Sequence, residues 1–229
     1  MRKPVLLLLS EKPWNKGLKE RLSQKINYDI RHIRDKDDLT LDLVLSIKPE
    51  WIMVPHWSHI IKKEIWESSK TVIFHMTDLP YGRGGSPLQN LIKRGHKHTV
   101  ISALQCREEM DAGDIYFKEN LDLHGTAEEI FIRADRTIEN MIIKLVCENP
   151  IPVSQSGDVI RFVRRKPSQS NLSECQDGDL CQWYDHIRML DAEGYPHAFL
   201  EANGMKLEFR RVSRRKDGLH ADVVIKPLL

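Results

Sequence analysis

Long apolar runs are missing from this chain of 229 residues, and their absence narrows the classes of protein to consider. The N-terminal run from Val5 to Leu9 is far shorter than the roughly 20 apolar residues of a membrane span. It also lacks the roughly 7–15 apolar residues and the small-residue cleavage site of a signal peptide. A buried first strand explains the run better, so we expect a cytoplasmic protein with no membrane partner.

Cysteine is also scarce, and the cysteines show neither a CxxC pair nor metal-ligand spacing with histidine. We therefore expect reduced, mostly structural thiols and no metal site. Charge of one sign is not in excess: the formal net charge of +2 is too small to argue for nucleic acid as a partner. The glycine-rich segment after His75 lacks the GxGxxG spacing of a dinucleotide site.

What is present in the first half is an alternation of short apolar runs with helix-like segments. Apolar or alternating runs predict strands, and apolar residues that recur every three or four positions predict helices. Strands are expected at 4–9, 28–33, 51–54 and 71–74, with helices at 16–25, 38–47 and 58–68. This order predicts an α/β fold with a mostly parallel sheet and helices on both faces.

The segment 75–87 interrupts this alternation with two prolines and three glycines. A loop of this length inside a compact domain is more often functional than a plain connector. It follows the strand at 71–74, and ligands of parallel sheets bind at the carboxyl ends of strands. Chemistry is therefore expected just after residue 74. Pro87 then begins a predicted helix, with Ser86 as its N-cap.

Further along, strands at 99–104 and 115–123 flank a turn at 109–114, and Thr126 with Glu129 forms a capping box for a long helix. A short helix is expected at 182–190, and alternating segments at 205–212 and 220–225 predict antiparallel strands. The expected organisation is a catalytic domain at 1–150, a linker or surface excursion at 151–173, and a small C-terminal β-rich subdomain at 174–229.

Two motifs and one loop resemble a known family. Residues 74–92 (FHMTDLPYGRGGSPLQNLI) are similar to the first signature of the 10-formyltetrahydrofolate-dependent formyltransferases, and residues 108–115 (EEMDAGDI) are similar to the second. Residues 54–66 (VPHWSHIIKKEIW) resemble the loop and helix that hold the pterin ring in that family. The resemblance covers roughly residues 45–150. It implies a Rossmann-like fold and 10-formyltetrahydrofolate as the co-substrate.

The resemblance also assigns roles to individual residues. It implies that His75 and Asp111 are catalytic. The residues that it implies for the folate are Trp57, Ser58, His59, Ile60, Met110 and Gly113. Those that it implies for the acceptor are Thr77, Arg83, Gly84, Ser86 and Pro87. Taken alone, three of these residues have a simpler structural interpretation. A histidine at a strand end, such as His75, is often structural, and Asp in a Gly-containing turn, such as Asp111, commonly caps backbone amides. Arg83 could be a solvated charge.

The chemistry of these residue types agrees with transfer of a formyl group to a primary amine. An amine attacks only through its lone pair, so a base must receive its proton. An unperturbed imidazole titrates near neutrality, which suits His75 to that role. Attack on the formyl carbon gives an oxyanion that needs nearby donors. Asp111 could orient the imidazole, support its charged form and relay a proton through water to the departing nitrogen.

One position departs from the family pattern. Two residues before the histidine the family has Asn, whose amide donates to the formyl oxygen, and here that position is Ile73. Loss of such a donor can cost roughly a hundredfold or more in rate. A backbone amide near Gly84, the side chain of His56 or that of Gln105 could replace it. Otherwise the chain could be a formyltetrahydrofolate hydrolase or a non-catalytic folate-binding relative.

The acceptor is predicted from the differences between this chain and the subclasses of the family. Residues 76–80 differ from the motif of the glycinamide ribonucleotide enzymes, and the tRNA enzymes carry a longer basic C-terminal barrel. The expected acceptor is therefore a nucleotide-linked amino sugar used for bacterial surface polysaccharide, with methionyl-tRNA or glycinamide ribonucleotide as the alternatives. Nucleic acid is not the expected partner, and a homodimer is left open. The basic clusters near residues 161–166 and 210–216 could bind phosphate or be solvated faces.

Overall fold

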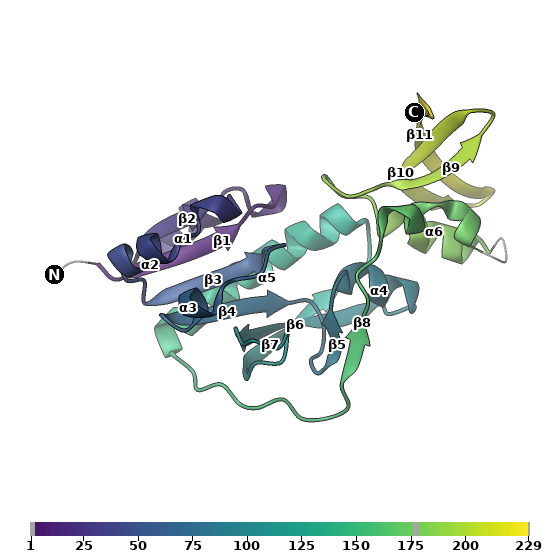
Figure 1. The fold of residues 1–229 in the computed structure, drawn as a ribbon. Helices are drawn as coiled ribbons and strands as arrows, with labels where there is room; N and C mark the ends of the chain where they lie inside the picture. The colour runs from purple at the N-terminus through teal and green to yellow at the C-terminus, as the bar shows by residue number, and fades with distance from the viewer. Residues whose placement is uncertain (1–2, 176–178, 229) are drawn as a thin grey trace. The chain divides into compact units, whose positions relative to one another are not determined.

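The computed structural model describes residues 3–175 and 179–228 (Figure 1), and the chain divides into two compact units. The first unit holds the described residues of Met1–Gly84, Thr99–Leu121 and Ile132–Arg161. The second holds those of Gly85–His98, Asp122–Phe131 and Phe162–Leu229. Within the described parts of the chain, no helix combines the length and the apolar character that a membrane span requires.

The first unit is built on a six-stranded sheet with the order β2-β1-β3-β4-β6-β7 (Figure 1). The strands are β1 (Val5–Ser10), β2 (Asp29–Ile33), β3 (Trp51–His56), β4 (Lys70–His75), β6 (His98–Gln105) and β7 (Ile115–Asp122). The first four run parallel, whereas β6 pairs antiparallel with β4. A separate two-stranded sheet joins β5 (Tyr81–Gly84) to β8 (Ile160–Phe162).

Helices cover both faces of this sheet. They are α1 (Leu18–Lys25), α2 (Leu41–Ile47), α3 (Lys63–Trp66) and α5 (Ala127–Glu148), with 3-10 turns at Pro13–Asn15 and Lys36–Asp38. Because side chains alternate between the faces of a strand, Leu7 and Leu9 share one face of β1. They pack with α2 and α3 in one core cluster, whose buried members are Leu7, Leu9, Ile33, Val44, Ile52, Val54, Ile61 and Ile65.

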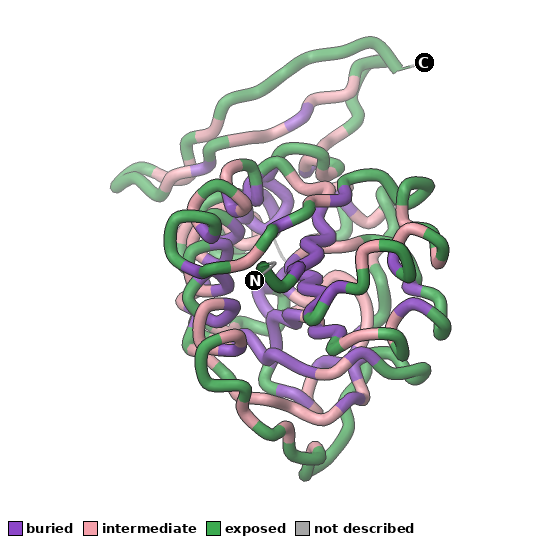
Figure 2. The backbone as a smooth tube through the Cα atoms, turned by 90° about the vertical axis from the view of Figure 1, so that its left-hand side faces the viewer, coloured by how far each residue is buried: buried purple, intermediate pink, exposed green. Residues whose placement is uncertain are grey.

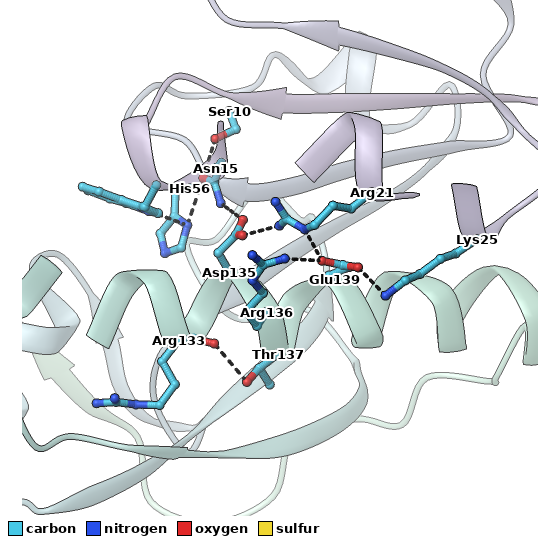
Figure 3. Close-up of polar contacts among 11 residues, drawn as sticks. Ser10, Asn15, Arg21, Lys25, His56, Arg133, Asp135, Arg136, Thr137 and Glu139 are labelled. Atoms are coloured by element: carbon cyan, nitrogen blue, oxygen red, sulfur yellow. Dashed lines mark hydrogen bonds and ion pairs between the residues drawn. The ribbon is translucent and has the colours of Figure 1, made fainter. Parts of the chain in front are cut away.

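On the other side, α1 and α5 are joined by a buried polar network that runs from the carboxyl end of β1 (Figure 3). Asn15 donates to Asp135 at 2.6 Å, and Arg21 forms ion pairs with both Asp135 and Glu139. Lys25 adds a bond to Glu139 at 2.6 Å. Burial raises the pKa of Asp135, a shift that the bonds from Asn15 and Arg21 oppose. These buried carboxylates are therefore held by partners that only the folded chain brings to them.

The second unit combines two helices with a three-stranded antiparallel sheet of order β11-β10-β9. Its elements are α4 (Pro87–Lys93), α6 (Leu180–Arg188), β9 (Ala198–Ala202), β10 (Met205–Arg215) and β11 (Gly218–Pro227), with 3-10 turns at Pro167–Ser170 and Leu172–Glu174. The hairpin of β10 and β11 is mostly half-buried or exposed, as the pink and green tube near the C-terminus shows (Figure 2).

The predicted fold class is confirmed: the sheet is mostly parallel, helices cover it, and a small β appendage follows. The expected capping box is present, because the Glu129 amide donates to the Thr126 hydroxyl and the Glu129 carboxylate accepts from the Thr126 amide. The predicted limits of the domains, at residues 150 and 173, stay a prediction. Residues 1–2, 176–178 and 229, which the predicted ranges include, lie outside the described residues.

Some predicted elements were wrong. The helix expected at 58–68 is reduced to α3, and the β-branched pair Ile60-Ile61 before it is a poor helix former. Strand β5 was missed because its glycines, Gly82 and Gly84, have positive φ and low strand propensity. Ser86 precedes α4 but does not cap it: its hydroxyl instead accepts from the Arg165 amide at 3.1 Å.

The buried network predicts a specific loss of stability. We expect Asp135→Ala to lower the free energy of unfolding by about 3 kcal/mol, because it leaves Arg21 and Asn15 without their buried acceptor. Arg136 is the matched control, since it also pairs with Glu139 but its side chain is 62% exposed. Arg136→Ala should cost less than about 1 kcal/mol. Urea denaturation measures both values, and equal losses would contradict this account of the network.

Candidate active site

His75 ends strand β4 and is buried, in register with Ser102 of β6. Its Nε2 lies 2.8 Å from the carbonyl oxygen of Gly82. Because a carbonyl oxygen only accepts, Nε2 carries the hydrogen, and Nδ1 is the basic nitrogen of the neutral ring. Nδ1 lies 3.6 Å from Oδ1 of Asp111. A proton taken up at Nδ1 would therefore sit beside a carboxylate.

Asp111 is held on both its side chain and its backbone. Its Oδ2 accepts from the Gly84 amide at 2.9 Å, which directs Oδ1 toward His75. Its backbone has a φ of 56°, in the left-handed region that aspartate tolerates better than most residues. The Gln155 side chain donates to its carbonyl at 2.8 Å. The structure thus places the two predicted catalytic side chains next to each other, while their catalytic roles stay a prediction.

The turn that carries Asp111 requires a glycine two residues later. A Cβ on Gly113 would lie 1.9 Å from the carbonyl oxygen of Gln105, far inside van der Waals contact. The Gln105 amide also donates to the Asp114 carbonyl at 2.9 Å. Gly113 therefore allows the turn to close against the end of β6. Met110, on the same turn, is 59% exposed, so its side chain is available to a ligand.

Arg83 is buried and has polar partners within the protein, so it is not a solvated loop charge. Its Nε and Nη2 donate to Oε1 of Gln155 at 3.1 and 2.8 Å, and its Nη1 lies 3.4 Å from Oε1 of Glu109. Arg161 forms an ion pair with the same Glu109 oxygen. The sequence argument missed Gln155 entirely, because a single glutamine in an irregular polar segment carries no motif signal.

Thr77 lies in the segment that connects β4 to β5. It is fully buried, and its hydroxyl is 3.4 Å from the Gly82 carbonyl oxygen that also accepts from His75. The Thr77 carbonyl in turn accepts from the Ser102 hydroxyl at 2.7 Å. These contacts fix the path of the chain after β4. Ser86 and Pro87 belong to the second unit, where Pro87 begins α4.

The predicted folate loop follows β3. Trp57 packs against the same core cluster as Ile73, and its ring meets that of His59 edge-on at 5.4 Å between centroids. His59 Nε2 lies 3.0 Å from Oε2 of Glu11. Burial opposes ionisation of Glu11, but hydrogen bonds from Lys12, Ser58 and His59 outweigh it and lower its pKa to about 2. The loop is therefore anchored to the end of β1 by an ionised carboxylate.

The residues of this loop fit a planar ring with a polar edge, such as a pterin. The indole N–H of Trp57 is buried and has no hydrogen-bond partner among the described residues, so a donor is left for a ligand. Ile60 is 89% exposed, which is unusual for a large apolar side chain in an ordered loop. An aromatic ligand would cover such a side chain.

Ile73 packs against the core cluster. Of the three groups considered as its replacement, Gly84 has its N–H bound within the protein, whereas Gln105 and His56 are bound through acceptor atoms. The Gly84 amide donates to Asp111. Gln105 accepts from Arg107 and is in register with Val72, which points to the sheet face opposite Ile73. Nδ1 of His56 accepts from the Trp14 indole at 3.2 Å.

Comparison with known proteins extends this picture. The formyl transferase family model matches residues 3–144, and a model described as the C-terminal domain of methionyl-tRNA formyltransferase matches residues 167–226. A methionyl-tRNA formyltransferase of Rickettsia felis is 27% identical over 164 residues, which are 69% of this chain and 52% of the relative. The chain spans about half the length of the curated relatives that it matches.

Solved structures agree on the fold. The methionyl-tRNA formyltransferase from Clostridium thermocellum is 48% identical with a TM-score of 0.94, and the match covers 98% of this chain and 99% of that one. HypX from Aquifex aeolicus, solved in complex with tetrahydrofolic acid, is 19% identical with a TM-score of 0.73, covering 90% of this chain and 37% of that one. A sugar N-formyltransferase from Shewanella sp. is 17% identical with a TM-score of 0.71, covering 91% of this chain and 97% of that one, which shows a shared fold alone.

These comparisons correct the predicted acceptor. A nucleotide-linked amino sugar was expected, with nucleic acid set aside as a partner, and both expectations are wrong. The curated relatives and the 48% identical structure are methionyl-tRNA formyltransferases, which were the stated alternative. The surface polysaccharide pathway therefore has no support.

The prediction of a formyltransferase is confirmed at the level of the family, which uses 10-formyltetrahydrofolate as its co-substrate. The matched region, residues 3–144, contains both His75 and Asp111 and covers more than half of the chain. This chain belongs to the formyl transferase family.

Proposed function

We propose that this protein transfers a formyl group from 10-formyltetrahydrofolate to the amino group of methionyl-tRNA in the cytoplasm. One observation carries the proposal: the similarity to a methionyl-tRNA formyltransferase of 48% identity extends over nearly the whole of both chains. The match of residues 167–226 to the C-terminal domain of such enzymes supports it. The cytoplasm follows from the acceptor, because charged tRNA is used there.

In this proposal His75 is the base that takes the proton of the attacking amine, and Asp111 stabilises the charged imidazole. The folate supplies the formyl group, so one carbon–nitrogen bond forms to the amine and the bond to the folate nitrogen breaks. His75 accepts the proton that the amine loses, at Nδ1, because Nε2 already donates to Gly82. Asp111 lies 3.6 Å away and stabilises the charged ring. Its second oxygen stays bound to Gly84, which keeps the carboxylate in place. A proton is then returned through Asp111 and water to the departing folate nitrogen, which leaves as the neutral amine.

The exposed cations of the second unit suit a phosphate-rich acceptor. Arg164 and Lys166 are exposed on the segment that passes α4, where Asn90 donates to the carbonyl of Val163 at 3.1 Å. Arg94 lies beside them, with its guanidinium 4.9 Å from the ring centroid of Phe162. Lysine and arginine that neutralise phosphates make binding salt-dependent. This surface supports RNA as the acceptor without identifying the nucleotides contacted.

The acceptor assay tests the proposal directly. Purified protein is incubated with 10-formyltetrahydrofolate and methionyl-tRNA, and formylmethionine is measured after deacylation. We expect formylation of the initiator tRNA, weakened as salt rises from about 50 to 200 mM. Parallel reactions contain a nucleotide-linked amino sugar or no acceptor. Formate release without acceptor would identify a hydrolase, and no turnover with any acceptor would indicate a binding protein. Either result refutes the proposal.

The predicted catalytic pair gives a second test. His75→Ala and Asp111→Asn should each lower kcat/KM by about 100-fold or more, because one removes the base and the other its compensating charge. His98 is the control histidine: its side chain is 78% exposed and pairs with Asp122. His98→Ala should leave the rate within about twofold of the original, as for most exposed side chains outside a site. Retention of a tenth of the activity by His75→Ala would exclude it as the base.

A further inference from the structure

A short segment outside both motifs lies along the turn of Asp111. Residues 153–155 follow α5 by a few positions and belong to no helix or long strand. The Val153 amide donates to the Ile115 carbonyl at 2.9 Å, and the Ile115 amide returns a bond of 2.8 Å. The Ser154 hydroxyl donates to Oδ1 of Asp114 at 2.9 Å. Three consecutive residues thus bind the turn at successive positions, and we name 153–155 the strap.

The last residue of the strap, Gln155, uses every part of its side-chain amide. Nε2 donates to the carbonyls of Asp111 and Gly113, both at 2.8 Å. Oε1 accepts from Nε and Nη2 of Arg83. One side chain therefore joins the loop after β4 to the turn after β6, and these loops carry the predicted acceptor-binding and catalytic residues.

The two hydrogen bonds from Gln155 to the turn are made at and close to a residue with an unfavourable backbone conformation. Asp111 is one of few described residues other than glycine with a left-handed backbone, and this conformation persists only when surrounding contacts determine it. The carbonyls of Asp111 and Gly113 bracket the turn and point to the same amide group. Fixing both carbonyls fixes the direction of the Asp111 side chain toward His75.

Glutamine is the residue type that this position requires. Glutamate of the same length would still accept from Arg83, but it has no hydrogen for the two carbonyls. Methionine fills a similar volume and can make neither set of bonds. Asparagine carries the same amide on a shorter stem. Glutamate therefore removes the bonds to the turn alone, methionine removes both sets, and the difference between the two variants reports on the bonds to Arg83.

We propose that Gln155 is a positioning residue for formyl transfer, which holds the Asp111 carboxylate against His75 and the Arg83 guanidinium against the acceptor site. The inference rests on the proposed function for its kinetic consequence, but not for its structural one. Gln155 touches neither reacting group. It acts on the reaction through Asp111 and Arg83.

Steady-state kinetics of two variants separate the two halves. Gln155→Glu should lower kcat for methionyl-tRNA formylation by about tenfold or more, because the turn loses its two hydrogen bonds from the side-chain amide. The KM for methionyl-tRNA should change little, because the introduced carboxylate would still accept the hydrogen bonds of Arg83. Gln155→Met should lower kcat similarly and also raise the acceptor KM. Ser154→Ala is the matched control: it removes one bond of the same strap without touching Asp111 or Arg83, and its constants should stay within about twofold.

Hydrogen exchange supplies a readout that does not depend on activity. The Gly84 amide, which donates to Asp111, should exchange about tenfold faster in both Gln155 variants than in Ser154→Ala, with melting temperatures within a few degrees. If wild-type protein does not formylate methionyl-tRNA, the proposed function fails, yet the exchange result still decides whether Gln155 holds the turn. Unchanged exchange at Gly84, or kcat loss that merely follows the unfolded fraction, would overturn the inference.

Discussion

The contact on which the rest of the site depends is the one between the Asp111 carboxylate and the Gly84 amide. This bond of 2.9 Å ties the loop after β4 to the turn after β6 and leaves the other carboxylate oxygen facing His75. A carboxylate that accepts a backbone hydrogen bond loses rotational freedom, so its second oxygen has a defined position. The Gln155 amide adds to this constraint by holding the backbone that carries Asp111. The geometry of the predicted catalytic pair therefore depends on two loops that bind each other directly and that Gln155 holds from outside either motif.

The support behind these loops comes from the sheet. Ile73 and Trp57 pack against one core cluster, so the strand that ends at His75 and the predicted folate loop share a rigid base. An isoleucine at that position adds apolar contact to the core. The tight approach of Gly113 to the end of β6 works in the same way, since it lets the turn rest directly on a strand. Sites on such elements hold their geometry better than sites on free loops.

The error about the acceptor has a physical reason. The motifs around His75 and Asp111 are predicted to act on the formyl carbon and the attacking amine, and these groups are common to every acceptor in the family. The parts that distinguish a tRNA from a nucleotide sugar lie far from the amine, and in the proposed function they would meet exposed surfaces such as the segment around Arg164 and Lys166. Short basic clusters on a chain of net charge +2 are ambiguous from sequence, because solvated faces look the same.

The sequence by itself determined the fold class, because strand alternation is a local property of the chain. That His75 and Asp111 lie together was expected only through the resemblance of their two motifs to those of the family, and the structure places them 3.6 Å apart. The sequence also predicted the capping box of Thr126 and Glu129, which involves neighbours within one helical turn. Only the tertiary structure decided that Arg83 is buried, that the Ser86 hydroxyl binds Arg165 in place of capping α4, and that Gln155 clamps both loops. Each of these contacts joins residues more than 40 positions apart, and no local pattern specifies which distant partner a single polar side chain will meet.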